Sequence, residues 1–236
     1  MSFCTITLSA NAGVSLDFGG VRIWVDALHR HRVPNFSSVS PELLEKVWAS
    51  DAFAAPDVIF YTHCHPDHYS RALTEEALAR WPGAQLILPE QEFPGQILLT
   101  GEEASYRFGG VTMEFRRLCH EKEQYADVPH YGALLSDGEK RILLPGDCAV
   151  ANPALSDWLG GVCPDAVLLD FPWITLQRGR RFIQDFLPTE HLIVYHLPFP
   201  QDDPSGYRAA VQRAAAWLDY LPDVRFLESP LQSITL

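Results

Sequence analysis

Basic residues are scarce in this sequence. Its 236 residues include 18 Lys and Arg against 30 Asp and Glu, which gives a formal net charge of −12. Such a balance repels polyanions, and no run of Lys and Arg with interleaved aromatic residues offsets it. We therefore expect no long nucleic acid among the partners of this protein.

Long apolar stretches are also lacking. No uninterrupted apolar run reaches the roughly 20 residues that a membrane-spanning helix requires. Met1 leads straight into FCTITLSANAG, without the basic segment and apolar run of a secretory signal. These two features predict a cytoplasmic protein without a membrane segment.

The cysteines do not form a recognisable framework. There are five of them, an odd number spread widely along the chain, and no C-x-x-C pair occurs. This pattern argues against both a disulfide scaffold and a zinc ribbon, so we expect reduced thiols. The residues are Cys4, Cys64, Cys119, Cys148 and Cys163.

Hydrophobic residues make up 47% of the chain, which is enough for one large core. No internal repeat, low-complexity tract or linker divides the sequence. We therefore expect a single domain over residues 1–236.

Short strands and capped helices alternate along this domain. Ser40 is a candidate N-cap before Pro41, and helices are predicted at 41–49, 70–81, 178–186 and 205–221. Strands are predicted at 5–10, 13–18, 21–27, 57–62, 85–89, 111–118, 131–136, 141–145, 166–171, 192–196 and 224–229. The combination of β-meanders with β-α alternation in both halves predicts an α/β (α+β) fold, in which two mixed sheets pack together with helices outside.

A dense group of polar residues follows the predicted strand 57–62. His63, His65, Asp67 and His68 place four potential metal ligands within six residues. In an extended segment His63 and His65 project to the same side, and the following turn can direct Asp67 and His68 toward a second ion. Imidazole and carboxylate donors together favour zinc, then iron or manganese. Cys64 should point the opposite way, as a small buried residue.

The stretch THCHPDH matches the T-H-x-H-x-D-H signature of the metallo-β-lactamase superfamily at every defined position. The sequence resembles a compact, stand-alone member of that superfamily over roughly residues 4–230. The resemblance implies a four-layer αββα sandwich with the site at one sheet edge. It also implies three later ligands, each following a strand: His120 after VTMEFRRLC, Asp147 in ILLPGDC and His196 in LIVYHLPF.

The resemblance implies a role for each of these residues. His63, His65 and His120 would bind one ion, Asp67, His68 and His196 would bind the other, and Asp147 would bridge the two. His130, which begins the next predicted strand, is the alternative to His120. If it is not a ligand, His130 could line the substrate pocket together with Tyr131.

Other polar residues near these segments have structural explanations. Asp26 ends a predicted strand and should be structural. His29 and His31 should lie in an exposed loop. Asp202 and Asp203 should cap the following helix rather than bind metal.

A pair of divalent ions lowers the pKa of a shared water. The resemblance therefore implies a dinuclear hydrolase, with Zn²⁺ first and Mn²⁺ or Fe²⁺ as alternatives. A metal-bridging hydroxide would cleave a small ester-type substrate, either a phosphodiester or a lactone. Asp67 would be catalytic as well as a ligand, because it would orient the hydroxide or accept its proton. The leaving group would be protonated through metal-bound water or by a pocket residue such as His130.

The superfamily contains several activities, and the sequence narrows them. The absence of a secretory signal argues against a periplasmic lactamase. The sequence ends with LQSITL, so we do not expect the helical C-terminal domain of the hydroxyacylglutathione hydrolases, and the acidic balance disfavours tRNA nucleases. We expect a small, anionic substrate.

Two other classes stay open. One is a mononuclear iron oxidoreductase resembling the persulfide dioxygenases, which share H-x-H-x-D-H. The other is a metal-binding protein without turnover, for which a missing ligand would be typical. The physiological substrate, the native metal and the oligomeric state stay open as well.

Overall fold

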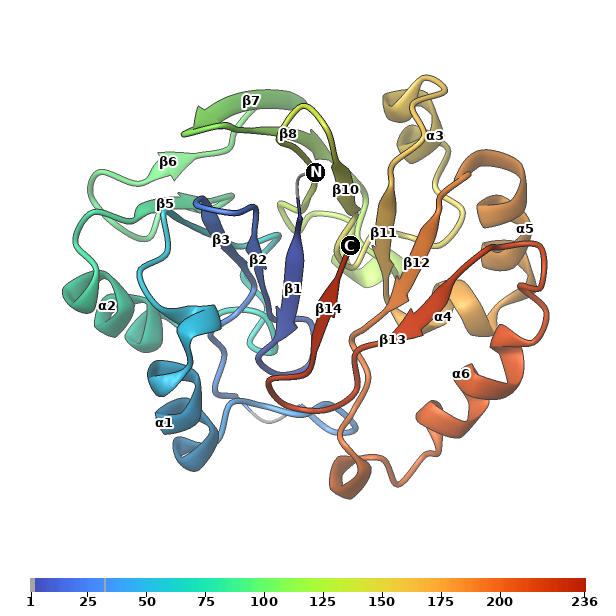
Figure 1. The fold of residues 1–236 in the computed structure, drawn as a ribbon, viewed down its shortest axis with the longest axis horizontal. Coiled ribbons are helices and arrows are strands. Elements are labelled where there is room, and N and C mark those ends of the chain that lie inside the picture. The colour runs from blue at the N-terminus through green and yellow to red at the C-terminus, as the bar shows by residue number, and fades with distance from the viewer. Residues whose placement is uncertain (1–2, 32) are drawn as a thin grey trace.

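Two seven-stranded β-sheets form the centre of the protein in the computed structural model, which describes residues 3–31 and 33–236 (Figure 1). The first sheet contains, in spatial order, β14 (Ser233–Thr235), β1 (Thr5–Leu8), β2 (Val14–Asp17), β3 (Arg22–Val25), β4 (Val58–Phe60), β5 (Gln85–Leu88) and β6 (Ile97–Leu98). The second contains β13 (Val224–Phe226), β12 (His191–Val194), β11 (Ala166–Leu169), β10 (Arg141–Leu144), β9 (Tyr131–Ser136), β8 (Val111–Arg117) and β7 (Glu103–Phe108).

Each sheet has an antiparallel and a parallel part. Strands β14, β1, β2 and β3 pair antiparallel, whereas β3, β4, β5 and β6 pair parallel. In the second sheet β7 to β10 are antiparallel and β10 to β13 are parallel. Parallel strands bring their carboxyl ends to the same edge of a sheet, which is where open α/β sheets bind ligands.

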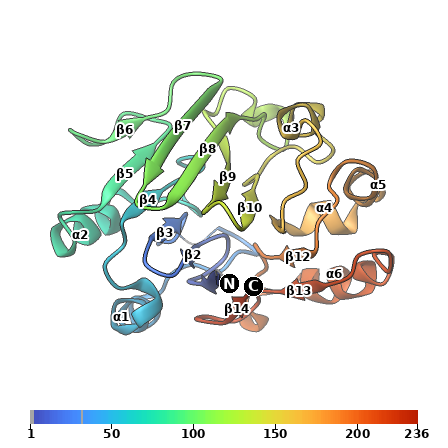
Figure 2. The ribbon, with the colours of Figure 1, turned by 45° about the horizontal axis from the view of Figure 1, so that its top comes forward.

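Helices cover the outer faces of both sheets. They are α1 (Pro41–Ala49), α2 (Arg71–Arg80), α3 (Pro153–Leu159), α4 (Phe171–Thr175), α5 (Gln177–Phe186) and α6 (Tyr207–Ala215). Short 3₁₀ turns lie at Asp51–Phe53, Glu123–Tyr125 and Pro200–Asp202. Helices α1 and α2 flank the first sheet and α3 to α6 flank the second, as Figure 2 shows from a second direction. The predicted αββα sandwich is therefore confirmed.

Alternating side chains along the central strands fill two separate cores. In β10, Ile142 and Leu144 join the cluster between the two sheets, and Leu143 joins the cluster beneath α3 to α6. In β11, Leu168 faces the first cluster and Val167 the second. Both faces of these strands are buried, which explains why they read as continuous apolar runs in the sequence.

Serine side chains cap the first two helices, and the cap at Ser40 was predicted. The Ser40 side chain accepts a hydrogen bond from the backbone N–H of Leu43 (3.2 Å), and Ser70 accepts one from Leu73 (3.5 Å). These bonds satisfy N–H groups that have no partner within the helix. The first helix starts at Pro41 as predicted, and the second starts at Arg71, one residue after its predicted start.

The last helix is shorter than predicted. It spans Tyr207–Ala215 rather than 205–221, because Leu218 and Leu221 follow in consecutive turns instead of further helix. Asp203 does cap it, and its carboxylate accepts from the backbone N–H of Tyr207 (2.8 Å). Asp202 does not, since it accepts the hydroxyl of Ser37 instead (2.8 Å).

Five elements were not predicted: β6, β7, β14, α3 and α4. Strand β7 has no buried residue and is held by six pairs with β8. Strand β14 pairs with β1 at the other end of the chain, Thr235 opposite Thr5. Such strands depend on distant partners and carry little local signal.

Two further expectations can be compared with the described residues. All five cysteines are free thiols, as predicted. Within residues 3–31 and 33–236, no helix combines the length and the apolar character needed to cross a membrane.

Candidate metal centre

A single buried carboxylate organises the loop that follows β4. Asp26, directly after β3, is fully buried. It accepts hydrogen bonds from the backbone N–H of Thr62 (2.8 Å), the hydroxyl of Thr62 (2.7 Å) and Nδ1 of His68 (2.9 Å). Asp26 thus has the structural role expected of it, and it also sets the orientation of the His68 ring.

The hydrogen bonds of Nδ1 determine which ring nitrogen of His63 and His120 keeps a lone pair that can bind a metal ion. The Thr62 hydroxyl donates to Asp26, so it accepts from Nδ1–H of His63 (2.9 Å). Nδ1–H of His120 donates to the carbonyl oxygen of Glu121 (2.7 Å). Both Nε2 atoms therefore present lone pairs, and they lie only 3.3 Å apart. Two facing lone pairs need a cation between them, so this pair fits a metal ion.

Asp147 lies between His68 and His196. Its Oδ2 atom is 3.3 Å from Nε2 of His68 and its Oδ1 atom is 3.5 Å from Nε2 of His196. The two Nε2 atoms are 3.1 Å apart. Oδ1 of Asp147 is buried and has no hydrogen-bond partner within the described part of the chain. A buried carboxylate oxygen in this position fits a metal ligand.

The electrostatics of the cluster favour bound positive charge. Burial lowers the pKa of His63 well below its usual value, so a proton is held poorly there. Burial acts in the same direction on His68, but the carboxylates of Asp147 and Asp26 outweigh it and raise the pKa of His68 well above its usual value. Burial acts to raise the pKa of Asp147, but the imidazoles of His68 and His196 hold it well below the ordinary range. A metal ion would replace the proton of His68.

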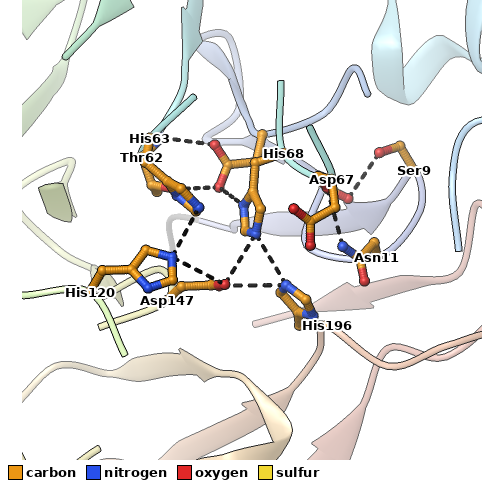
Figure 3. Close-up of polar contacts among 11 residues, drawn as sticks. Ser9, Asn11, Thr62, His63, Asp67, His68, His120, Asp147 and His196 are labelled. Carbon is orange, nitrogen blue, oxygen red and sulfur yellow. Dashed lines mark hydrogen bonds and ion pairs between the residues drawn. The ribbon is translucent and has the colours of Figure 1, made fainter. Parts of the chain in front are cut away.

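The donors form three overlapping groups, and within each group the ligand atoms lie within 4.8 Å of one another. Figure 3 shows most of these side chains pointing toward a common centre. The groups are His63 with His65 and His120, His63 with His68 and Asp147, and Asp67 with His68 and His196. All seven residues predicted as ligands are thus brought together from loops after β4, β8, β10 and β12. That they bind metal remains a prediction.

His130 belongs to none of these groups, and the geometry favours His120. The His130 ring is fully buried, 5.3 Å from the His63 ring between centroids. Its Nδ1 contacts the carbonyl oxygen of Leu118 (3.1 Å). His130 thus packs behind the ligands.

A cavity of about 440 Å³ opens beside the donors. Its lining comprises Val33, Phe36, His65, Pro66, Asp67, His120, Glu121, Lys122, Tyr125, Asp147, Asp170, Phe171, Pro172 and His196. The expectation that His130 and Tyr131 could line the pocket is wrong, because neither reaches this cavity. The Tyr131 hydroxyl instead donates to the carbonyl oxygen of Gly101 (2.6 Å).

Several lining residues were not found from the sequence. Phe36 packs edge-on against the His196 ring (4.8 Å between centroids), and Tyr125 packs against His65 (4.7 Å). Asp170 was hidden in the apolar run AVLLDF, where it reads as the end of a strand.

The prediction for the loop after β3 was half wrong. His31 is exposed as expected, but His29 is fully buried. Its Nε2 contacts the carbonyl oxygen of Ser37 (3.2 Å), because the loop folds back and the Val39 N–H bonds to the His29 carbonyl (3.2 Å). Burial lowers the pKa of His29 to about 3, so the ring is neutral at physiological pH.

Solved structures share this architecture. Igni18, described as a metallo hydrolase from the archaeon Ignicoccus hospitalis, is 19% identical with a TM-score of 0.66, over 99% of this chain and 98% of that one. The metallo-β-lactamase fold protein YhfI from Bacillus subtilis is 11% identical with a TM-score of 0.68, over 100% of both chains. An isothiocyanate hydrolase from Delia radicum gut bacteria is 16% identical with a TM-score of 0.66, over 99% of this chain and 98% of that one.

No protein-family model matches the sequence, and no curated protein matches it either. The fold is nevertheless clear, because the similarity to these structures extends over nearly the full length of each chain. The chain has the metallo-β-lactamase fold.

Proposed function

We propose that this protein is a metal-dependent hydrolase that uses two divalent ions. The observation that carries the proposal is the pair of Nε2 atoms of His63 and His120, whose lone pairs face each other at 3.3 Å. The hydrolases among the structures of the same fold support the assignment.

The ligands divide between the two ions as the resemblance implies. His63, His65 and His120 would hold one, Asp67, His68 and His196 the other, and Asp147 would contact both. This donor set favours zinc. When bound, two such ions supply hydroxide at neutral pH and polarise the bond to be broken.

The chain itself positions the reactants. The side-chain amide of Asn11 donates to the backbone carbonyl of Asp67 (3.2 Å), which holds that residue beside His68. The Asp67 carboxylate then orients the attacking water and accepts its proton. Replacing Asp67 by Asn should reduce turnover strongly.

The cavity suggests the substrate class. Its volume of about 440 Å³ suits a small molecule, and Phe36, Tyr125 and Phe171 supply apolar walls. Lys122 is the one Lys or Arg of the lining among the described residues. We therefore propose a small ester-type substrate, a phosphodiester or a lactone, that carries a negative charge.

Metal analysis and turnover test this proposal together. We expect about two equivalents of zinc or manganese in the purified protein, and cleavage of bis(4-nitrophenyl) phosphate or of γ-butyrolactone. One equivalent of iron with oxygen consumption would instead support a dioxygenase. Full metal content without turnover of any ester would support a binding protein.

A further inference from the structure

One carboxyl group in the cavity has no function in the site described so far. Asp170 directly follows β11, lines the cavity and is only 6% exposed. Its Oδ1 atom is buried and has no hydrogen-bond partner among residues 3–31 and 33–236. Buried polar groups are nearly always paired, because leaving one unpaired costs free energy. The missing partner therefore needs an explanation.

Neither the helix nor the donor groups provide that partner. Asp170 occupies the N-cap position of α4, but its side chain makes no capping hydrogen bond. It also belongs to none of the three groups of metal donors in the described chain. The remaining partner is a molecule in the cavity.

The topology places Asp170 beside the reacting groups. Strands β10, β11 and β12 are parallel neighbours, and the chain after them supplies Asp147, Asp170 and His196 respectively. All three residues line the same cavity. Asp170 thus follows the strand that lies between the two strands leading to the proposed ligands Asp147 and His196.

Two other side chains of the lining, those of Glu121 and Lys122, are less suited to meet a substrate at this point. Glu121 is occupied, since it accepts from the Val150 N–H (2.6 Å) and from Arg178 (2.9 Å). Lys122 is exposed at the cavity mouth. His130 does not line the cavity, so it is not placed to protonate a leaving group there.

We propose that Asp170 hydrogen-bonds the leaving-group oxygen of the substrate and protonates it as the ester bond breaks. This inference rests on the proposed hydrolase function. Hydroxide adds to the carbonyl carbon or the phosphorus, the bond to the leaving oxygen breaks, and that oxygen keeps the electron pair. It takes the proton of the Asp170 carboxyl and leaves as an alcohol. Water at the cavity mouth returns a proton to the Asp170 carboxylate.

The surroundings of Asp170 support this role. The Asp170 carboxyl is almost fully buried, and its Oδ1 atom has no partner among the described residues. Burial of an unpaired carboxyl favours its neutral form, and a neutral carboxyl can donate the proton that the leaving oxygen needs.

Paired esters with good and poor leaving groups test the proposal. They are 4-nitrophenyl butyrate with ethyl butyrate, and methyl 4-nitrophenyl phosphate with dimethyl phosphate. Asp170→Asn should lower kcat/KM by about 100-fold or more for the alkyl ester, because an alkoxide must be protonated to leave. The loss should be less than about 3-fold for the 4-nitrophenyl ester, because nitrophenolate leaves without a proton. Equal losses for both members of a pair would overturn the proposal.

Asp165→Asn is the matched control. Asp165 lies just before β11, at the other end of the same strand, where it accepts from the backbone N–H of Arg141 (2.7 Å). Asp165→Asn should leave kcat/KM unchanged for both members of each pair. The metal content of Asp170→Asn should equal that of the wild type. A lost equivalent would make Asp170 a metal ligand and overturn its role as an acid.

Thermal melting gives a readout that does not depend on activity. Asp170→Leu removes an unpaired buried carboxyl, so Tm should rise by about 2–4 °C. A fall in Tm would show that Asp170 is structural and would overturn the proposal. A wild-type protein that holds metal but cleaves none of these esters refutes the hydrolase function itself. An active wild type with equal losses refutes only the role of Asp170.

Discussion

The proposed metal ligands come from two regions that are built differently. The loop after β4 supplies four donors within six residues, and Asp26 anchors this loop through Thr62 and His68. The second sheet supplies His120, Asp147 and His196 from three separate loops. The first set depends on local chain geometry. The second set meets only because strands distant in sequence end at one edge of the sheet.

The two regions are also supported differently. One carboxylate fixes the contiguous loop, through Thr62 and His68. Each residue of the scattered set has its own support. A β-bridge between His120 and Cys148 brings two of the loops together, and the N–H of His196 bonds to the carbonyl oxygen of Asn11 (3.1 Å). Removal of one supporting side chain should therefore displace more ligands in the contiguous loop than in the scattered set.

The largest difference in metal content is expected between His68→Ala and His196→Ala. His68 belongs to two donor groups and His196 to one. His68→Ala should retain less than one equivalent of metal and lose turnover on the order of 10³-fold. His196→Ala should retain about one equivalent. Metal analysis after gel filtration decides this, and equal losses would contradict the division into overlapping groups.

Asp26→Asn should weaken metal binding about 10- to 100-fold without removing any ligand. The reason is that Asp26 orients His68 directly and His63 through Thr62. Competition with a zinc chelator measures the affinity. Asp57→Asn is the control, because Asp57 accepts from the backbone N–H of Arg22 (2.8 Å), away from the site. Equal affinity of Asp26→Asn and wild type would mean that the loop needs no such anchor.

Gly146→Ala tests the support of Asp147 on the scattered side. Gly146 has a φ of +62°, and an added Cβ would lie 2.7 Å from Nε2 of His130 and 3.1 Å from Cβ of Thr62. We expect the free energy of unfolding to fall by about 1–3 kcal/mol, which lowers Tm by about 2–4 °C for each kcal/mol. Gly138→Ala shares a positive φ (+95°) but meets nothing within 4 Å, so its loss should be smaller. Identical Tm changes would exclude crowding as the cause.

The smallest effect on metal content is expected for His130→Phe. If His120 is the third histidine ligand of the first ion, this variant keeps all of its metal, whereas His120→Ala loses about one equivalent. His130→Phe should only lower Tm, because it removes the buried contact with the Leu118 carbonyl oxygen. Loss of metal in His130→Phe would reverse the assignment.

Much of the fold could be predicted, because its signals are local. The serine N-cap of α1, apolar periodicity, apolar runs and turn residues placed α1, α2 and most strands. The prediction failed where a segment depends on a distant partner. Strand β7 has no buried residue of its own, and β14 exists by pairing with β1. For the same reason apolar periodicity extended α6 too far, since Leu218 is buried in a turn.

The site shows the same limit. The contiguous ligands were visible from their spacing, and the scattered ones only through a resemblance to a known family. His29 looked exposed because nothing in its neighbours shows that residues 35–39 fold back over it. The burial of Asp170 and the position of His130 behind the ligands could not be read from adjacent residues either.

The sequence by itself determined the chemistry of the donors and the pattern of strands and helices, because residue type and short-range periodicity are properties of contiguous chain. Only the tertiary structure decided that His120 rather than His130 faces His63, and that Asp170 meets the cavity. Those outcomes depend on which strands become neighbours and on where their carboxyl ends meet, and sheet pairing joins residues far apart in the chain.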